Sequence, residues 1–237
     1  IVDGNTIQLS SLTTGGFNAD FDGDQMAIFH PLTIESQNEA KKRIMLARSS
    51  SSSTAITFEL SKEMCVGLYL LTSNIKQSKP YIHITEKDID SAIDPTIPVV
   101  YKKQNTTMGK AIVNNCFPSD FRFIDDQLTK GKANKLILEV IKKYGDNIGG
   151  QVASKLKDVG FKFSTILSPT FNIDEITIPQ KIYDLKKKLD KASTEEAYKI
   201  LGEMREILIN HLKKTGVYYL VDSGATKGWD QPFQLLA

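Results

Sequence analysis

The sequence has little of what marks membrane, secreted or zinc-binding proteins. It contains no apolar run of roughly 18 residues, the length that a membrane-spanning helix needs, and no signal-peptide pattern at its start. Its two cysteines, Cys65 and Cys116, form no C-x-x-C pair, so we expect reduced thiols and no structural zinc. These absences predict a protein of a reducing compartment such as the cytoplasm.

The sequence also lacks a large excess of acidic or basic residues. Lys and Arg number 30 against 28 Asp and Glu, which gives a formal net charge of +2 at pH 7. Composition therefore does not predict nucleic-acid binding, and any such contact must be local. The 237 residues, 41% of them hydrophobic, suffice for one or two cores. Because the chain lacks an initiator methionine and starts in strand-like sequence, we expect it to be part of a larger fold.

The most informative stretch is N-A-D-F-D-G-D-Q-M-A, residues 18–27. It places Asp20, Asp22 and Asp24 at alternate positions, and in an extended segment alternate side chains lie on one side of the backbone. Gly23 allows a tight bend there without the clash of a Cβ atom. Converging carboxylates repel one another unless a cation neutralises them, and an oxygen-only cluster suits Mg²⁺. The spacing therefore predicts a metal site.

Two other interpretations of this stretch are a calcium loop and a solvated polar turn. An EF-hand counted from Asp20 needs glycine at its sixth position and glutamate at its twelfth, where this chain has Gln25 and Pro31. The calcium loop is thereby excluded. The solvated turn stays open, but apolar side chains flank and interleave the acids, which favours a loop held by a core. These apolar residues are Phe17, Phe21, Met26, Ala27, Ile28 and Phe29.

The same residues resemble a known family. N-A-D-F-D-G-D (18–24) looks like the signature of the largest subunit of multisubunit DNA-dependent RNA polymerases, and Q-M-A (25–27) extends the likeness to the bacterial β′ form. The resemblance implies that Asp20, Asp22 and Asp24 hold the catalytic Mg²⁺ and that Asn18 lies beside the ribose of the incoming nucleotide. It also implies supporting roles for Gly23, Gln25, Met26, Gln231 and Gln234.

Later motifs follow in the order of the family. T-T-M-G-K (106–110) resembles its T-T-x-G-R, with Lys110 in place of arginine, and D-S-G-A (222–225) resembles the segment before its bridge helix. The resemblance implies an α+β fold in three parts. Residues 1–57 would form the C-terminal part of a double-psi β-barrel with the metal loop and the following helix. Residues 58–178 would be pore-like, and residues 179–237 would be funnel-like helices and the start of the loop before the bridge helix.

Local patterns predict the individual elements. We expect two short strands within residues 1–16, joined at Asp3-Gly4, and a helix after Thr33 as its N-cap. The further expected elements are a helix within 58–72 capped by Ser61, a strand at 81–84, a helix at 85–93 capped by Thr85, helices at 134–145 and 151–161 ending at Gly145 and Gly160, a helix after Pro179, and a long helix from Thr194 ending at Gly216.

The activity implied by the resemblance is DNA-directed RNA synthesis, a nucleotidyl transfer that needs the full multisubunit assembly. Two Mg²⁺ ions take part in such a reaction, one held by the three aspartates and one arriving with the nucleotide. The implied partners are a β-like subunit, the remaining portions of β′, the DNA template, the nascent RNA and nucleoside triphosphates. No membrane is implied.

Other hypotheses stay open at this point. The chain could be a non-catalytic assembly module of a split polymerase, or part of an RNA-silencing-type two-barrel RNA polymerase, which shares the D-x-D-G-D loop. It is either a piece of a longer subunit or a naturally split subunit of the kind that some large phages encode. The second case would place it in an infected host cell, the first in the bacterial cytoplasm.

Overall fold

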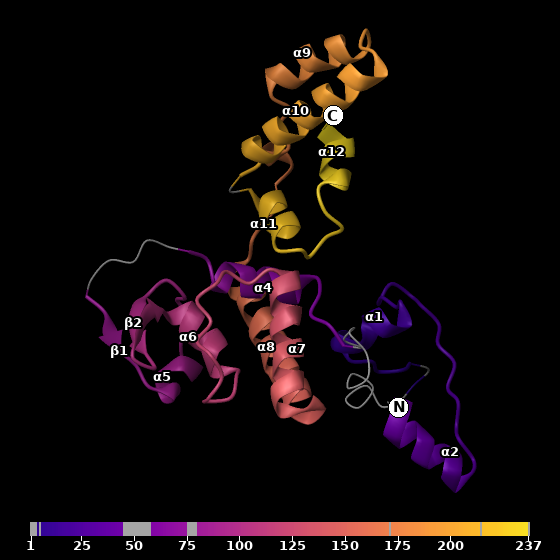
Figure 1. Ribbon diagram of the computed structural model, residues 1–237, viewed down its shortest axis with the longest axis vertical. Coiled ribbons are helices and arrows are strands. Elements are labelled where there is room, and N and C mark those ends of the chain that lie inside the picture. Colours follow the sequence, from indigo (N-terminus) through magenta and orange to yellow (C-terminus); the bar gives the residue numbers. More distant parts are fainter. Residues whose placement is uncertain are drawn as a thin grey trace.

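The computed structural model describes residues 4, 6–44, 58–74, 80–170, 172–213 and 215–236, with the backbone alone for residues 43 and 44. Helices dominate these residues, and the strands among them form one three-stranded sheet, so the predicted α+β class is confirmed (Figure 1). Among the helices of this described part, none is long and apolar enough to cross a membrane.

The elements fall into three groups along the chain (Figure 1). The N-terminal group comprises η1 (Ser11–Thr13), α1 (Thr14–Phe17), α2 (Ile34–Glu39) and the π-helical turn η2 (Ala40–Ile44). The central group comprises α4 (Glu63–Leu71), β1 (Ile82–His83), α5 (Glu86–Asp90), β2 (Pro98–Tyr101), β3 (Gln104–Thr107), α6 (Met108–Asn115), α7 (Lys130–Tyr144) and α8 (Asp146–Leu167). The C-terminal group comprises η4 (Ile173–Glu175), α9 (Gln180–Leu189), α10 (Thr194–His211), α11 (Gly216–Asp222) and α12 (Asp230–Leu236).

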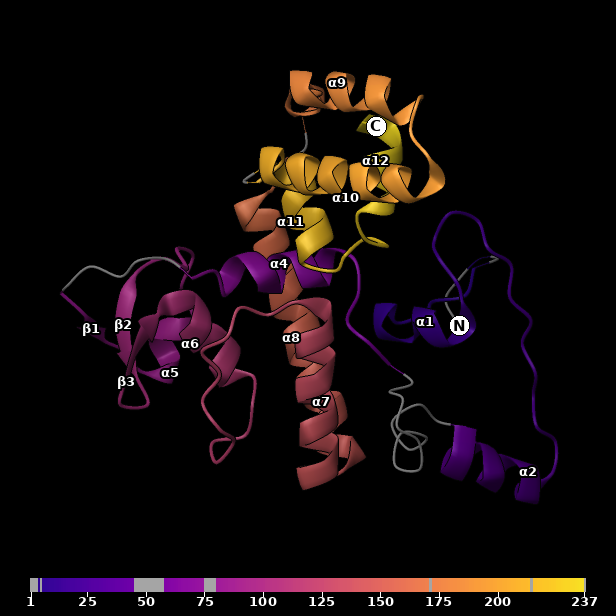
Figure 2. The same cartoon turned by 45° about the horizontal axis from the view of Figure 1, so that its top comes forward.

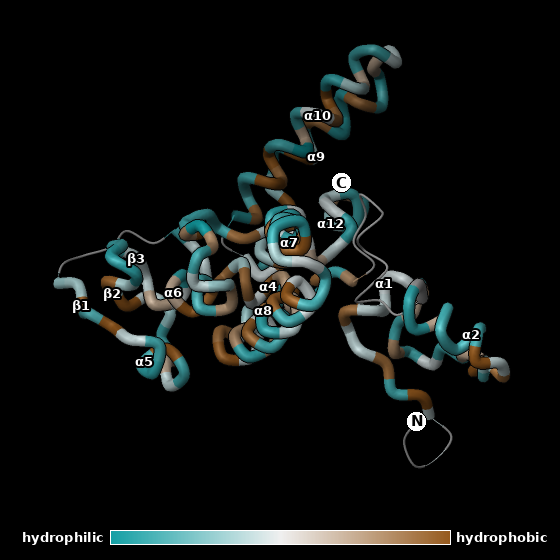
Figure 3. The backbone as a smooth tube through the Cα atoms, turned by 60° about the horizontal axis from the view of Figure 1, so that its bottom comes forward, coloured by the Kyte–Doolittle hydropathy of each residue, from teal (hydrophilic) through white to brown (hydrophobic). Residues whose placement is uncertain are grey.

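The main hydrophobic core forms where α4 crosses α8, with α7 alongside (Figure 3). Glycines set this crossing: a Cβ atom at Gly67 would lie 1.9 Å from the carbonyl oxygen of Gly160, and one at Gly160 would lie 2.5 Å from that of Met64. The prediction that a helix ends at Gly160 is therefore wrong, because this glycine lies inside α8 and permits close backbone contact rather than termination.

The sheet joins this core through Val99 and Tyr101 of β2, and α6 packs on β2 and β3. β1 pairs with β2 in parallel and β2 with β3 antiparallel, in the register Ile82↔Val99 and Val100↔Asn105. The expected strand at 81–84 and the Thr85 cap of the next helix are confirmed. Sequence patterns did not predict β2 and β3, because Lys102 and Lys103, both with positive φ, form their turn in place of the usual Asn or Gly.

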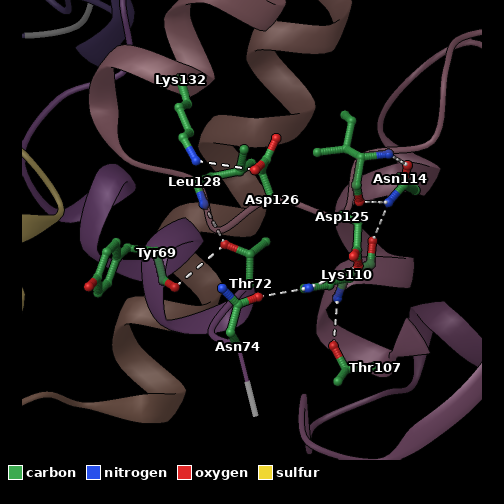
Figure 4. A network of polar contacts seen from close by, with 11 residues as sticks. Tyr69, Thr72, Asn74, Thr107, Lys110, Asn114, Asp125, Asp126, Leu128 and Lys132 are labelled. Carbon is green, nitrogen blue, oxygen red and sulfur yellow. Dashed lines mark hydrogen bonds and ion pairs between the residues drawn. The ribbon is translucent and has the colours of Figure 1, made fainter. Parts of the chain in front are cut away.

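A polar network fixes the irregular segment between α6 and α7 (Figure 4). Lys110 is buried, and its Nζ donates to Asn74 Oδ1 at 3.0 Å and to Asp125 Oδ1 at 2.9 Å. Asn114 bonds both the N–H and the carbonyl of Ile124, each at 2.8 Å. Lys110 therefore has a structural role here: its ammonium compensates for burial by pairing with these two oxygens.

A second, smaller core joins α9, α10 and α12 (Figure 2). Ile182 and Leu185 of α9 are buried against Met204 and Leu208 of α10, and the predicted helix after Pro179 is confirmed. The expected end of the long helix at Gly216 is wrong. α10 ends at His211, and Gly216 opens α11, where its N–H donates to Glu175 Oε2 at 3.0 Å.

The N-terminal group contains no strand among residues 6–44, so the predicted strands at 6–16 are replaced by coil, η1 and α1. The proposed hairpin at Asp3-Gly4 lies largely outside the described residues. A strand needs a neighbour for its backbone hydrogen bonds, and no described strand lies beside this segment. The double-psi barrel and the three-part division stay predictions.

Two predicted helix caps have different outcomes. Thr33 Oγ1 accepts from Ser36 N at 3.2 Å and caps α2 as expected. Ser61 does not cap α4. The helix starts one residue later, after Lys62, which has positive φ and makes no side-chain cap bond.

We expect both cysteines to be unreactive in the native protein. Burial raises the pKa of Cys65 and of Cys116 to about 12, so only about one thiol in ten thousand is ionised at pH 8. An aromatic disulfide reagent at pH 8 should label neither residue until urea is added, and Cys65→Ser and Cys116→Ser variants assign each signal. Rapid labelling of either thiol without urea would contradict this burial.

Candidate metal centre

The local backbone turns the acidic loop away from α1. Asn18 ends α1 in the left-handed region with φ of 48°, and its N–H donates to the carbonyl of Gly15 at 3.2 Å. Further on, Gly23 has φ of +126°, a conformation that side-chain-bearing residues rarely adopt. The tight bend predicted at Gly23 is confirmed.

The three carboxylates converge. Asp20, Asp22 and Asp24 each offer one oxygen, and these oxygens all lie within 4.8 Å of one another. Two backbone donors orient them: Asp20 N donates to Asp24 Oδ2 at 3.0 Å, and Asp22 N donates to Asp20 Oδ1 at 3.3 Å. Among the described residues this is the one group of three or more metal-ligating side chains, and all three are exposed.

The closeness of the carboxylates shifts the pKa values of Asp20 and Asp22 in opposite directions. A side-chain hydrogen bond with Asp20, together with the negative charges of Asp20 and Asp24, raises the pKa of Asp22. Hydrogen bonds from the side chain and backbone of Asp22 lower the pKa of Asp20, with a smaller contribution from the positive charge of Lys62. Of these two carboxyls, Asp22 therefore keeps its proton to the higher pH, and a divalent cation between them would compete with that proton.

The donor set fits Mg²⁺. Opposite ligands of an octahedral Mg²⁺ ion are about 4.2 Å apart, twice the Mg–O distance of roughly 2.1 Å. Any three ligands of one such ion include adjacent pairs, which are about 3.0 Å apart. The three oxygens, all within 4.8 Å of one another, would close to this spacing by rotation of their exposed side chains. Carboxylate oxygens without sulfur or imidazole favour a hard cation over zinc or copper.

The loop borders an open pocket of about 450 Å³. Gln25 and Met26, predicted as supporting residues, line it together with Asp20, Gly23 and Asp24, and Thr6, Ile7 and Leu9 also line it. Gln231 and Gln234 do not join this site, because they lie on α12, which both ribbon views place with the C-terminal helices (Figures 1 and 2). Asn18 lies at the base of the loop rather than in the pocket wall.

The expectation that a core holds the loop is wrong for this chain. The apolar side chains around the acids face outward: Phe21 is 69% exposed, Ile28 is 66% exposed and Phe29 is 88% exposed. Leu32 and Ile34 continue this exposed apolar surface along the chain. Apolar surface of this kind is typical of a face that is covered when a protein assembles.

Comparison with known proteins gives concordant matches. A family model described as RNA polymerase Rpb1, domain 2, matches residues 1–46, which include the acidic loop. The β′ subunit of DNA-directed RNA polymerase from Sulfurihydrogenibium sp. (strain YO3AOP1) is 31% identical over 82% of this chain. The chain belongs to the β′ family. The β′ subunits of Thermosipho melanesiensis and Rubrobacter xylanophilus are 31% and 25% identical over 99% of the chain.

The chain spans only a part of these relatives. It covers 13% of the Sulfurihydrogenibium β′ subunit, 17% of that of Thermosipho melanesiensis and 22% of that of Rubrobacter xylanophilus. Within this β′ segment, sequence reasoning missed Glu59, whose N–H donates to the carbonyl of Leu12 just before α1, and Lys62, whose positive charge acts on Asp20. No motif marks them, because their partners are remote in sequence.

Proposed function

We propose that this β′ segment carries the catalytic metal site of a DNA-directed RNA polymerase, with Asp20, Asp22 and Asp24 as the ligands of Mg²⁺. The observation that supports this most is the convergence of three carboxylate oxygens within 4.8 Å in the part of the chain that the family model matches. Carboxylates held this close repel one another, and a cation between them would offset that repulsion.

The proposed role of this chain is to position the metal ion and so to neutralise charge at the reacting phosphate. When bound, Mg²⁺ lowers the pKa of the RNA 3′-hydroxyl and neutralises charge on the α-phosphate that it attacks. The three carboxylates would fix that ion, and the positive φ of Gly23 lets Asp22 and Asp24 approach it from one loop. Asn18, at the base of the loop, would contact the ribose of the incoming nucleotide. Positioning of the reacting groups and neutralisation of their charge would account for the acceleration of the reaction, as in other phosphoryl transfers.

A second ion would arrive with the nucleoside triphosphate, so this chain needs to supply only one set of ligands. The proposed partners are the remaining portions of β′, a β-like subunit, the DNA template and the nascent RNA, in the bacterial cytoplasm. The exposed Phe21, Ile28 and Phe29 support assembly with other polypeptides, because they would be buried there.

Removal of divalent metal tests the proposal. We expect RNA extension by the purified complex that contains this chain to stop in excess EDTA and to return with added Mg²⁺, because no side chain replaces the charge of the ion. Radiolabelled primer extension measures this. Ca²⁺, which prefers more ligands at longer distances, serves as the control and should restore little activity.

A non-catalytic assembly module is the second candidate function, and the exposed apolar side chains around the loop favour it. Under this alternative the acids would be solvated and dispensable. RNA synthesis that persists when these acids are replaced would support the assembly module and place the active site on another chain.

A further inference from the structure

The acidic loop is attached to the rest of the chain through few contacts. Leu12 is the one buried residue among residues 4 and 6–42, and its carbonyl accepts from Glu59 N at 3.1 Å. The side chain of Glu59 also lies over α1, where a Cβ atom at Gly15 would be 3.4 Å from Glu59 Oε1. The place of the loop relative to the core is therefore set by Glu59 together with α8, which η1 also contacts.

Glu59 is in turn held by α7. Its Oε1 pairs with Lys130 Nζ at 3.0 Å, at the first residue of that helix. The neighbouring residue is fixed as well, because Asn134 Oδ1 accepts from Leu60 N at 2.9 Å and Asn134 Nδ2 donates to the carbonyl of Leu60 at 3.2 Å. The segment before α4 is thereby docked along the start of α7.

Lys130 also contacts the D-S-G-A turn at the end of α11. Its N–H donates to the carbonyl of Ser223 at 2.7 Å. Gly224 has φ of +79°, and a Cβ atom there would lie 2.9 Å from Lys130 Cβ, so the turn is pressed against this residue. Beside it, the Tyr69 hydroxyl donates to Asp222 Oδ2 at 2.5 Å. One residue thus touches both the support of the acidic loop and the turn that leads to α12.

We propose that Lys130 is a positioning residue for the metal loop, acting through Glu59 and coupling the loop to the D-S-G-A turn. This inference rests on the proposed function of the loop. Lys130 does not touch the carboxylates. Its ammonium restrains Glu59, and the Glu59 segment restrains Leu12 and α1, from which the loop starts. Loss of the ammonium lets Glu59 move, and the carboxylates then spend less time in the arrangement that binds a divalent cation.

The test compares variants in the assembled polymerase. Lys130→Met removes the charge but keeps the backbone bond to Ser223, Lys130→Arg keeps the charge, and Glu59→Gln breaks the same pair from the other side. The matched control is Lys132→Met. Lys132 also lies in the first turn of α7 and pairs with an acid, Asp126, at 3.3 Å, but it does not contact Glu59. Binding of Mn²⁺ as a probe is measured by electron paramagnetic resonance, and RNA extension is measured against Mg²⁺ concentration.

We expect Lys130→Met and Glu59→Gln to weaken Mn²⁺ binding about two- to fivefold, the ratio that corresponds to a partly exposed ion pair. The Mg²⁺ concentration for half-maximal extension should rise by the same factor. The double variant should bind Mn²⁺ as weakly as either single variant and no more weakly, because both substitutions remove the same interaction. Lys130→Arg and Lys132→Met should match the unmodified complex.

Two failures are distinguishable. If Asp22→Ala abolishes Mn²⁺ binding and RNA synthesis while Lys130→Met behaves like Lys132→Met, the positioning role is overturned and the proposed function stands. If Asp22→Ala leaves both measurements unchanged, the proposed function fails, and the positioning role fails with it. Should Lys130→Met not assemble, the same comparison is made with Glu59→Gln, which leaves Lys130 and its backbone contact in place.

Discussion

Replacing Asp22 with alanine should lower RNA synthesis by the assembled polymerase by about 10³-fold or more, the loss that accompanies removal of a group that stabilises transition-state charge. Asp22 is the middle one of the three proposed ligands, and its carboxylate bonds Asp20 and is repelled by Asp24. Without it the remaining two carboxylates offer a cation fewer ligands and less charge. Its side chain is exposed, so the fold should be unaffected.

Primer extension by complexes containing Asp22→Ala measures this effect, with equal incorporation of the chain confirmed by native mass spectrometry. The matched control is Asp184→Ala, an exposed acid on α9 that belongs to the C-terminal helices. We expect this control to extend RNA normally. Normal extension by Asp22→Ala would falsify the assignment of the acidic loop as the catalytic centre.

The second large effect concerns stability. Gly67→Ala should lower the free energy of unfolding by about 3 kcal/mol or more, because overpacking at a tight contact forces backbone movement. A methyl group at this position would meet the carbonyl oxygen of Gly160 at 1.9 Å, and that oxygen belongs to backbone that no side-chain rotation can displace. The α4–α8 crossing would have to open, and the main core with it.

Gly202→Ala is the matched control, since it is also a glycine inside a helix but has no atom within 4 Å of the added Cβ. Alanine should stabilise α10 there by about 0.5–1 kcal/mol through its better helix propensity. Thermal unfolding and the yield of assembled complex report both changes. Equal stability of the two variants would show that α4 and α8 do not pack as closely as described.

Local rules account for most of the correctly predicted elements. The Thr33 cap, the capping box at Thr85 and the end of α7 at Gly145 all depend on residues within one helical turn. The errors at Gly160 and Gly216 share a cause. A glycine after an apolar stripe predicts a helix end, but the same residue also allows two backbones to touch or opens the next helix, and only its neighbours in space distinguish these cases.

For the candidate site too, the local arrangement was predicted correctly and the surroundings were not. The alternation of Asp20, Asp22 and Asp24 around Gly23 predicted converging carboxylates, and the structure confirms this because their spacing is local. The surroundings of the loop were predicted incorrectly. Apolar residues beside the acids suggested a core, yet Phe21 and Phe29 face outward, because burial depends on what other segments the chain brings near.

The sequence by itself determined the convergence of the three carboxylates, the oxygen-only donor set that they offer and the membership of the β′ family, since all three depend on short motifs. Only the tertiary structure decided how the loop is supported. Lys130 meets Glu59 across 71 positions of sequence, and Tyr69 meets Asp222 across 153. Neither pair carries a local pattern, because their contact exists only once α4, α7 and α11 have packed together.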